Sequence, residues 1–148
     1  MVFPAVPDAA IVLGADAADW RAAVDLAGAA LTASGATTAD YAHEMIRMIE
    51  EHGPYVVIAP GLALAHARPG PAVLRDGLAI VTLTTPVPFG NAHNDPVRVV
   101  LGLAVASPEH HLSLVAEIAN VFNDSDAIAR LAAAASADEV RGILGAIA

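Results

Sequence analysis

The chain has 148 residues, with sixteen acidic residues against seven basic ones and no cysteine. All seven basic residues are arginines, and the net charge at pH 7 is −9. These numbers exclude disulfides, thiolate metal sites, cysteine nucleophiles and a lysine Schiff base. They also argue against nucleic acid or an anionic membrane surface as a partner, since both need a basic footprint. A chain of this length is expected to form one domain, 1–148, with its own core.

The hydrophobic fraction of 56% does not indicate a membrane protein, because alanine supplies 35 of these residues. No stretch of large apolar residues is long enough to cross a bilayer. The N-terminus also lacks a basic segment followed by an apolar one, so we expect no secretory signal. A cytoplasmic protein without direct membrane insertion is the expectation.

Two helices are predicted in the first third of the chain. Residues 1–10 contain two prolines and are expected to form an irregular arm. Residues 16–34 carry apolar side chains at helical spacing, and Gly35 suits the end of that helix. A second helix is predicted from Thr37 to the Gly53-Pro54 pair, which would end it.

Three or four strands are predicted next, over residues 55–58, 62–66, 78–83 and 97–105. The last of these is almost continuously apolar, which is typical of a central strand covered on both faces. Pro86 and Pro88 are expected to close the strand before it.

Three more helices are predicted after the strands. Ser107-Pro108 has the N-cap and first-turn residues of a helix, residues 124–134 form a short helix, and Ser136 begins the last one. The inward face of the first of these helices is expected to carry His111, Leu114, Val115, Ile118 and Phe122. The order of elements predicts a sheet with helices packed on it, in the α/β or α+β class.

His66 is the first candidate for a reactive residue. It ends an apolar strand before a turn rich in proline and glycine, and the alanines on either side leave its imidazole accessible. A neutral imidazole is a nucleophile near pH 7 without an activating base. Arg68 follows two residues later and can donate to a phosphate or a carboxylate. The alternative is a strand-end histidine that only hydrogen-bonds to its turn.

His110 and His111 lie in the first turn of a predicted helix, where free backbone N–H groups and the helix dipole favour an anion. His111 shares the inward face of that helix, and His110 is expected to point to solvent. For both residues a solvated helix start is the alternative.

The remaining histidines have ordinary interpretations. His43 and His52 lie on a polar helix face, and turn composition explains His93. No pair has the spacing of a metal site, so neither a metal nor another cofactor is expected, although a zinc site built from three distant histidines stays an alternative. The chain contains no glycine-rich nucleotide motif and no nucleophile elbow.

The segment 53–69, GPYVVIAPGLALAHARP, resembles the active-site segment of enzyme IIA components of the bacterial sugar phosphotransferase system. The similarity is with the mannitol/fructose class and, within it, with the ascorbate-type branch. The segments 86–90 and 94–97 and the His111-Leu112 helix start are similar to that family as well. The resemblance extends from about residue 11 to the end of the chain.

This resemblance implies a mixed β-sheet with helices packed on both faces, in the α/β class. It implies that His66 accepts a phosphoryl group from the carrier HPr and passes it to enzyme IIB. The supporting histidine falls at His111, or at His110 one residue before, and Arg68 is a further candidate to hold the phosphate. One departure is Ala65, where most relatives have proline before the active histidine.

The implied partners are HPr, enzyme IIB and, through enzyme IIB, the permease enzyme IIC. The sequence does not give the oligomeric state, although the alanine-rich helices would permit a homodimer, and nucleic acid is not expected. Because both protein partners must approach His66, apolar residues should surround it, with Leu62, Leu64 and Phe89 as candidates.

Two other interpretations remain. The first is a regulatory relative that is phosphorylated on His66 and binds a sensor or a transcription factor. The second is a metal-dependent hydrolase on a similar scaffold.

Overall fold

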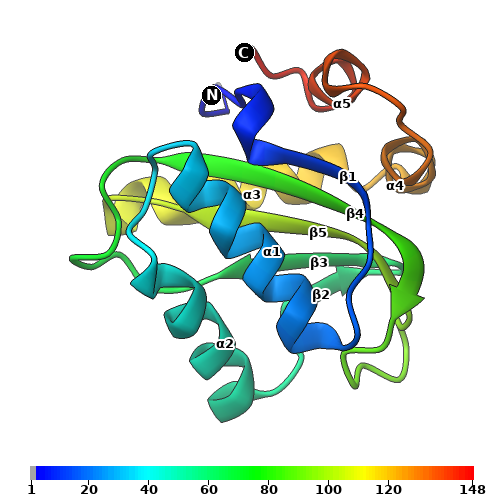
Figure 1. Cartoon of the computed structure of the whole chain (residues 1–148), viewed down its shortest axis with the longest axis horizontal. Helices are drawn as coiled ribbons and strands as arrows, with labels where there is room; N and C mark the ends of the chain where they lie inside the picture. Colours follow the sequence, from blue (N-terminus) through cyan, green and yellow to red (C-terminus); the bar gives the residue numbers. More distant parts are fainter. Residues whose placement is uncertain (1–2) are drawn as a thin grey trace.

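The computed structural model describes residues 3–148 and contains one mixed five-stranded sheet surrounded by helices (Figure 1). The strands are β1 (Ile11–Ala15), β2 (Val57–Ala59), β3 (Leu62–His66), β4 (Gly77–Val87) and β5 (Val97–Ala104). The helices are α1 (Trp20–Ala33), α2 (Asp40–His52), α3 (Pro108–Val121), α4 (Ser125–Ala132) and α5 (Ala137–Leu144), with a 3-10 helix η1 (Asp8–Ala10) before β1.

The sheet has the strand order β1-β4-β5-β3-β2. The pairs β1–β4 and β3–β5 are parallel, whereas β4–β5 and β2–β3 are antiparallel. β5 lies in the centre, and all of its residues except Arg98 are buried. This confirms the expectation of a central strand covered on both faces. His66 pairs with Leu103 at the end of β3, so the sheet fixes its backbone.

Helices cover both faces of the sheet. Figure 1 shows α1 and α2 in front of the sheet and α3 behind it. α1 contacts β4 and β5 directly, and α2 packs against α1. On α3, the side chains of Leu114 and Ile118 are buried. α4 contacts β4 and β5 as well. The predicted fold class, a mixed sheet with helices on both faces, is therefore confirmed.

The sequence analysis missed strand β1, so the predicted order that begins with two helices is wrong. The apolar run at this strand is only three residues long and ends at Gly14, whose φ of 65° interrupts the extended backbone. The pairing with β4 also shifts between Val12 and Ala15. Tertiary pairing with β4, rather than local pattern, makes this segment a strand.

Three predicted boundaries differ from the structure for local reasons. α1 begins at Trp20, because the side chain of Asp19 accepts a hydrogen bond from the Ala22 N–H. α2 begins three residues after Thr37, which instead forms a β-bridge with Val73. β4 continues through Pro86, where the pairing with β5 is irregular and needs no N–H donor.

The segment 1–10, expected to be an irregular arm, includes η1 and packs against the end of the chain. The Val6 N–H donates to the Ile147 carbonyl at 2.7 Å, and the Val6 side chain is buried. Residues 1–2 of that arm lie outside the described residues. None of the helices in the described part of the chain is both long and apolar enough to cross a membrane.

Candidate active site

His66 is held at the end of β3 by its own strand. Its Nδ1 lies 2.9 Å from the Leu64 carbonyl oxygen. A carbonyl oxygen can only accept, so Nδ1 carries the proton and Nε2 carries the lone pair. The backbone around His66 thus selects one tautomer and leaves Nε2 as the nucleophilic nitrogen.

The His66 ring lines an open cavity of about 670 Å³. The wall is mostly apolar and comes from α2, the segments after α2 and β3, and the start of α3. Its residues are Met48, His52, Tyr55, His66, Ala67, Arg68, Pro69, Pro108, His111 and Leu112. A small group that reaches this cavity would meet three imidazoles and one guanidinium. The third imidazole is that of His52, which the sequence placed only on a polar helix face.

The structure brings His111 to His66, with ring centroids 5.1 Å apart. His111 lies in the first turn of α3, whose N-cap Ser107 accepts a hydrogen bond from the His110 N–H. Two histidines that are far apart in the sequence therefore face one cavity. At this distance the two rings pack against each other, and both line the cavity.

His110 does not join this pair. Its exposed ring places Nδ1 3.1 Å from an Asp76 carboxylate oxygen, and the other Asp76 oxygen accepts from the Ala106 N–H. His110 thus helps to fix the loop before α3, and it does not line the cavity. Of these two histidines, His111 lines the cavity with His66 and His110 does not.

Burial lowers the pKa of His66 and of His111. For His66, desolvation is the largest cause, the hydrogen bond to Leu64 partly offsets it, and repulsion from His111 adds to the lowering of the pKa. For His111, desolvation alone lowers the pKa. Both rings therefore favour the neutral form near pH 7, which His66 needs in order to act as a nucleophile.

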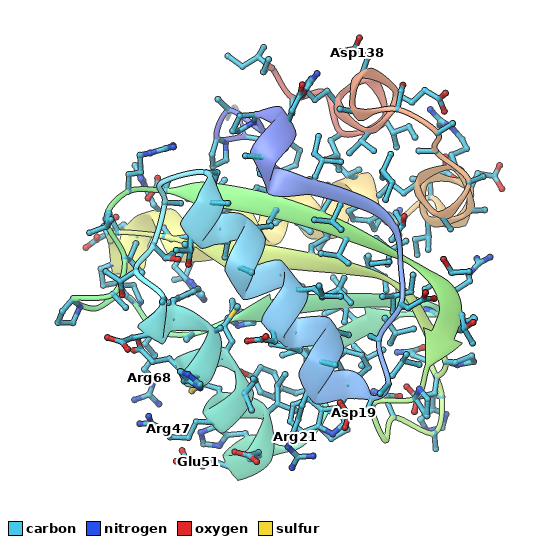
Figure 2. All side chains as sticks on the ribbon, in the orientation of Figure 1. Asp19, Arg21, Arg47, Glu51, Arg68 and Asp138 are labelled. Carbon is cyan, nitrogen blue, oxygen red and sulfur yellow. The ribbon has the colours of Figure 1, made fainter. Side chains whose placement is uncertain are left out.

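Arg68 lies at the edge of the cavity beside α2. It also lines a neighbouring hollow with Arg47, Glu44 and Glu51, and Figure 2 shows Arg68, Arg47 and Glu51 on the same side of the molecule. Within residues 3–148, no hydrogen bond or ion pair engages the Arg68 guanidinium. The group can therefore turn toward an anion at His66.

The family model for the phosphoenolpyruvate-dependent sugar phosphotransferase system, EIIA 2, matches residues 6–146. The chain belongs to this family. EIIA components are phosphotransferase relay proteins, so the chain is a phosphotransferase relay component.

Relatives and solved structures agree with this family. The ascorbate-specific PTS system EIIA component of Shigella boydii is 35% identical over 135 residues, which are 90% of this chain and 88% of that protein. A crystal structure from Streptococcus mutans, assigned as a PTS IIA (PtxA), has 37% identity and a TM-score of 0.84 over 93% of this chain and 88% of that one. The mannitol enzyme IIA of Escherichia coli, solved in complex with phosphorylated enzyme IIB, has 27% identity and a TM-score of 0.85 over 97% and 99% of the two chains.

The apolar surround of His66 in this EIIA chain differs from the one expected. Leu62, Leu64 and Phe89 are buried in the core, and Phe89 packs against Trp20 with ring centroids 6.1 Å apart. None of these three predicted residues lines the cavity. Leu62 and Leu64 lie on the same face of β3 as His66 but in its buried part, and Phe89 lies in another segment after β4.

The residues that do surround His66 were missed because they come from other elements. Tyr55 meets the His66 ring edge-on with centroids 5.8 Å apart, and Met48 belongs to α2. Leu112 is 73% exposed next to His111. The signal that the sequence offered was the place of Leu112 directly after the candidate His111.

The turn at 91–96 supports the EIIA sheet rather than the cavity. The Asp95 carboxylate accepts from the N–H groups of Phe89, Gly90 and Asn91, and the Asn94 side chain donates to the Val57 carbonyl at 3.2 Å. His93 lies exposed on this turn, away from His66. Among residues 3–148, no group of three His, Cys, Asp or Glu side chains could hold a metal ion.

Proposed function

We propose that His66 is the phosphoryl acceptor and donor of this EIIA chain, taking the group from phospho-HPr and passing it to enzyme IIB. The observation that carries the proposal is the hydrogen bond from His66 Nδ1–H to the Leu64 carbonyl at 2.9 Å. It directs the lone pair to Nε2, on a ring that lines a cavity open to a partner.

The transfer is an exchange of one N–P bond for another. The lone pair of His66 Nε2 attacks phosphorus in line, the N–P bond of the donor breaks, and its electron pair stays on the donor nitrogen. With a protonated donor ring no proton moves, because the proton on His66 Nδ1 stays against the Leu64 carbonyl. The protein contributes position and charge stabilisation rather than a covalent group of a different kind.

His111 is proposed to hold the transferred group. Its ring lies beside His66 at the N-terminal end of α3, where the helix dipole favours negative charge. Arg68 supplies a positive charge at the edge of the same cavity. Together these groups offset the charge on the phosphoryl oxygens during transfer.

The onward acceptor is proposed to be enzyme IIB, which in turn serves the permease enzyme IIC. The support is the family together with the complex between mannitol enzyme IIA and phosphorylated enzyme IIB. Ascorbate or a related carbohydrate is the proposed substrate of the whole system, since the ascorbate-specific relatives share about a third of their residues with this chain.

The experiment is intact mass spectrometry after incubation with phosphoenolpyruvate, enzyme I and HPr. Wild type should gain one acid-labile phosphoryl group, and His66→Ala should gain none. The matched control is His93→Ala, which removes an exposed histidine outside the cavity and should be phosphorylated like wild type.

Adding purified enzyme IIB afterwards tests the second half of the relay. The phosphoryl group should leave wild type and appear on enzyme IIB. Phosphate on the His66→Ala variant would contradict the site. Phosphate that stays on wild type in the presence of enzyme IIB would contradict the transfer step and favour a regulatory role.

A further inference from the structure

Tyr41 contacts the active-site strand from inside the core. It is the second residue of α2, and its side chain has no exposed surface. Its ring fills space between α2 and the sheet, which a phenylalanine would do equally well. The hydroxyl is therefore the part of the side chain that needs a separate explanation.

The hydroxyl joins the residue that follows β3 to strand β5 by hydrogen bonds. The Ala67 N–H donates to Tyr41 Oη at 3.0 Å, and the Tyr41 O–H donates to the Leu103 carbonyl at 2.7 Å. The Ala67 carbonyl lies at 3.3 Å from the same oxygen. Because the hydroxyl has a single proton, the nearer Leu103 oxygen is its acceptor.

The bridge lies where β3 ends. Ala67 directly follows His66, and Leu103 is the residue that pairs with His66 in the parallel β3–β5 ladder. The peptide after His66 is thus tied to β5 through Tyr41, while the His66 ring is tied to Leu64 on the other side. One bond orients the ring and the other orients the backbone that carries it.

Burial raises the pKa of Tyr41 to about 12. The hydroxyl therefore keeps its proton throughout the range in which the protein works. The bridge is a fixed connection between Ala67 and Leu103 rather than a switch that responds to pH.

We propose that Tyr41 is a positioning residue for phosphoryl transfer: its hydroxyl clamps the peptide after His66 against Leu103 and so holds Nε2 of His66 toward the cavity. The inference rests on the proposed function of His66. It assigns Tyr41 no contact with the phosphoryl group.

The test compares two variants that each remove one hydroxyl group of a buried residue; Tyr41→Phe loses two hydrogen bonds and Thr82→Val loses one. Tyr41→Phe removes the bridge and keeps the ring. Thr82→Val is the matched control, because Thr82 is buried in β4 and its hydroxyl accepts from the Gly14 N–H at 2.9 Å, at the other side of the sheet. Single-turnover transfer from phospho-HPr is measured over a range of HPr concentrations.

Tyr41→Phe should lower the maximal transfer rate by on the order of tenfold and leave the half-saturating HPr concentration unchanged, since a small misplacement of a reacting atom is enough for such a loss. Thr82→Val should match wild type in both the maximal transfer rate and the half-saturating HPr concentration. Equal losses in the two variants, or a wild-type rate in Tyr41→Phe, would overturn the proposal.

Nitrogen NMR of the His66 ring gives a readout that does not depend on phosphorylation. Wild type and Thr82→Val should show the single Nδ1–H tautomer, and Tyr41→Phe should show a mixture. An unchanged tautomer in Tyr41→Phe would overturn the clamp even if the rate fell. If wild type accepts no phosphate, the proposed function fails, and the tautomer measurement still decides the role of Tyr41.

The rates are expressed per folded molecule, as judged by near-ultraviolet circular dichroism. If Tyr41→Phe is partly unfolded, all samples are measured in sucrose, which strengthens burial because it is excluded from the protein surface. A rate that returns to the wild-type value on refolding would show that Tyr41 acts through stability alone.

Discussion

At the scale of single residues, His66 combines a partly buried ring with an accessible lone pair. Burial makes the charged imidazole unfavourable, and the Leu64 carbonyl accepts the one proton of the neutral ring. The result is an imidazole that stays neutral and presents Nε2 to a partner. A surface histidine would be partly protonated near its ordinary pKa and would lose part of its nucleophilic form.

The lowered pKa of His66 predicts how acceptance of phosphate depends on pH. As the pH falls, the rate should decline with a midpoint below 6.5, the ordinary pKa of histidine, because burial lowers the pKa of His66. The measurement is an NMR titration of the His66 ring together with the transfer rate from phospho-HPr. A titration midpoint at or above 6.5 would contradict the prediction.

The same shift predicts how stability depends on pH. Below pH 6.5 the unfolded chain protonates this histidine before the folded chain does, so the unfolded state binds more protons. The free energy of unfolding should therefore fall as the pH drops below 6.5, and His66→Gln should make this fall shallower. The measurement is denaturant unfolding of wild type and His66→Gln at several pH values. The same dependence of the free energy of unfolding on pH in both proteins would contradict the prediction.

His111 and His110 give a matched pair of variants one residue apart. His111→Ala removes a proposed phosphate donor and should slow transfer by about a hundredfold, the loss typical of one donor to a developing anion. His110→Ala removes an exposed ring that contacts Asp76 and should change the rate less than about twofold, in line with a surface charge pair. Comparable losses in both variants would contradict the assignment of His111.

Sequence reasoning could separate these two histidines only in part. Helical spacing placed His111 on the inward face, because it shares that face with the buried Leu114 and Ile118. The partner of His110 could not be predicted, since Asp76 lies 34 residues away and belongs to the segment before β4. Local pattern thus indicates which way a side chain points, but not what it meets.

At the scale of elements, the long and strongly patterned segments were predictable and the short ones were not. β5 has a nearly unbroken apolar run and was predicted within one residue of its observed end. β1 has only a short run and becomes a strand through its pairing with β4. The cavity wall was missed for a related reason: α2, the segment before β2 and the start of α3 meet only in the folded chain.

The contact between α1 and α2 predicts the effect of a single methyl group. A Cβ at Gly28 would overlap the Ala42 Cβ and lie 2.9 Å from the Ala42 Cα, so the two helices would have to separate. Gly28→Ala should lower the free energy of unfolding by about 1–3 kcal/mol, the range for overpacking a core. Denaturant unfolding measures the change.

The matched control for this contact is Gly142→Ala, in α5, where the new Cβ would meet nothing within 4 Å. This variant should be more stable than wild type by roughly 0.5–1 kcal/mol, because alanine loses less backbone entropy than glycine in a helix. Stabilisation by both substitutions would contradict the close α1–α2 contact.

At the scale of the whole molecule, the two ends of the chain complete the fold together. Figure 1 shows the termini side by side, next to α5. Arg141 of α5 donates to the Val6 carbonyl at 3.0 Å and to Asp8 at 2.8 Å, and the Val6 N–H donates to Ile147. The first residues and the last helix therefore depend on each other, and no described residue of either lines the His66 cavity.

Deleting residues 1–6 should therefore loosen α5 without disabling the site. The deletion removes the buried side chains of Phe3 and Val6, each worth about 1.5 kcal/mol of apolar burial, so the free energy of unfolding should fall by about 3 kcal/mol. Amide exchange in α5 should accelerate, while the transfer rate per folded molecule should stay at the wild-type value, because residues 3–10 do not line the His66 cavity.

Ile147→Ala is the control, since its side chain is 65% exposed and the variant keeps the backbone bond to Val6. Unchanged exchange in α5 after the deletion would contradict the mutual dependence of the termini, and a slower transfer rate would show that the arm acts on the site.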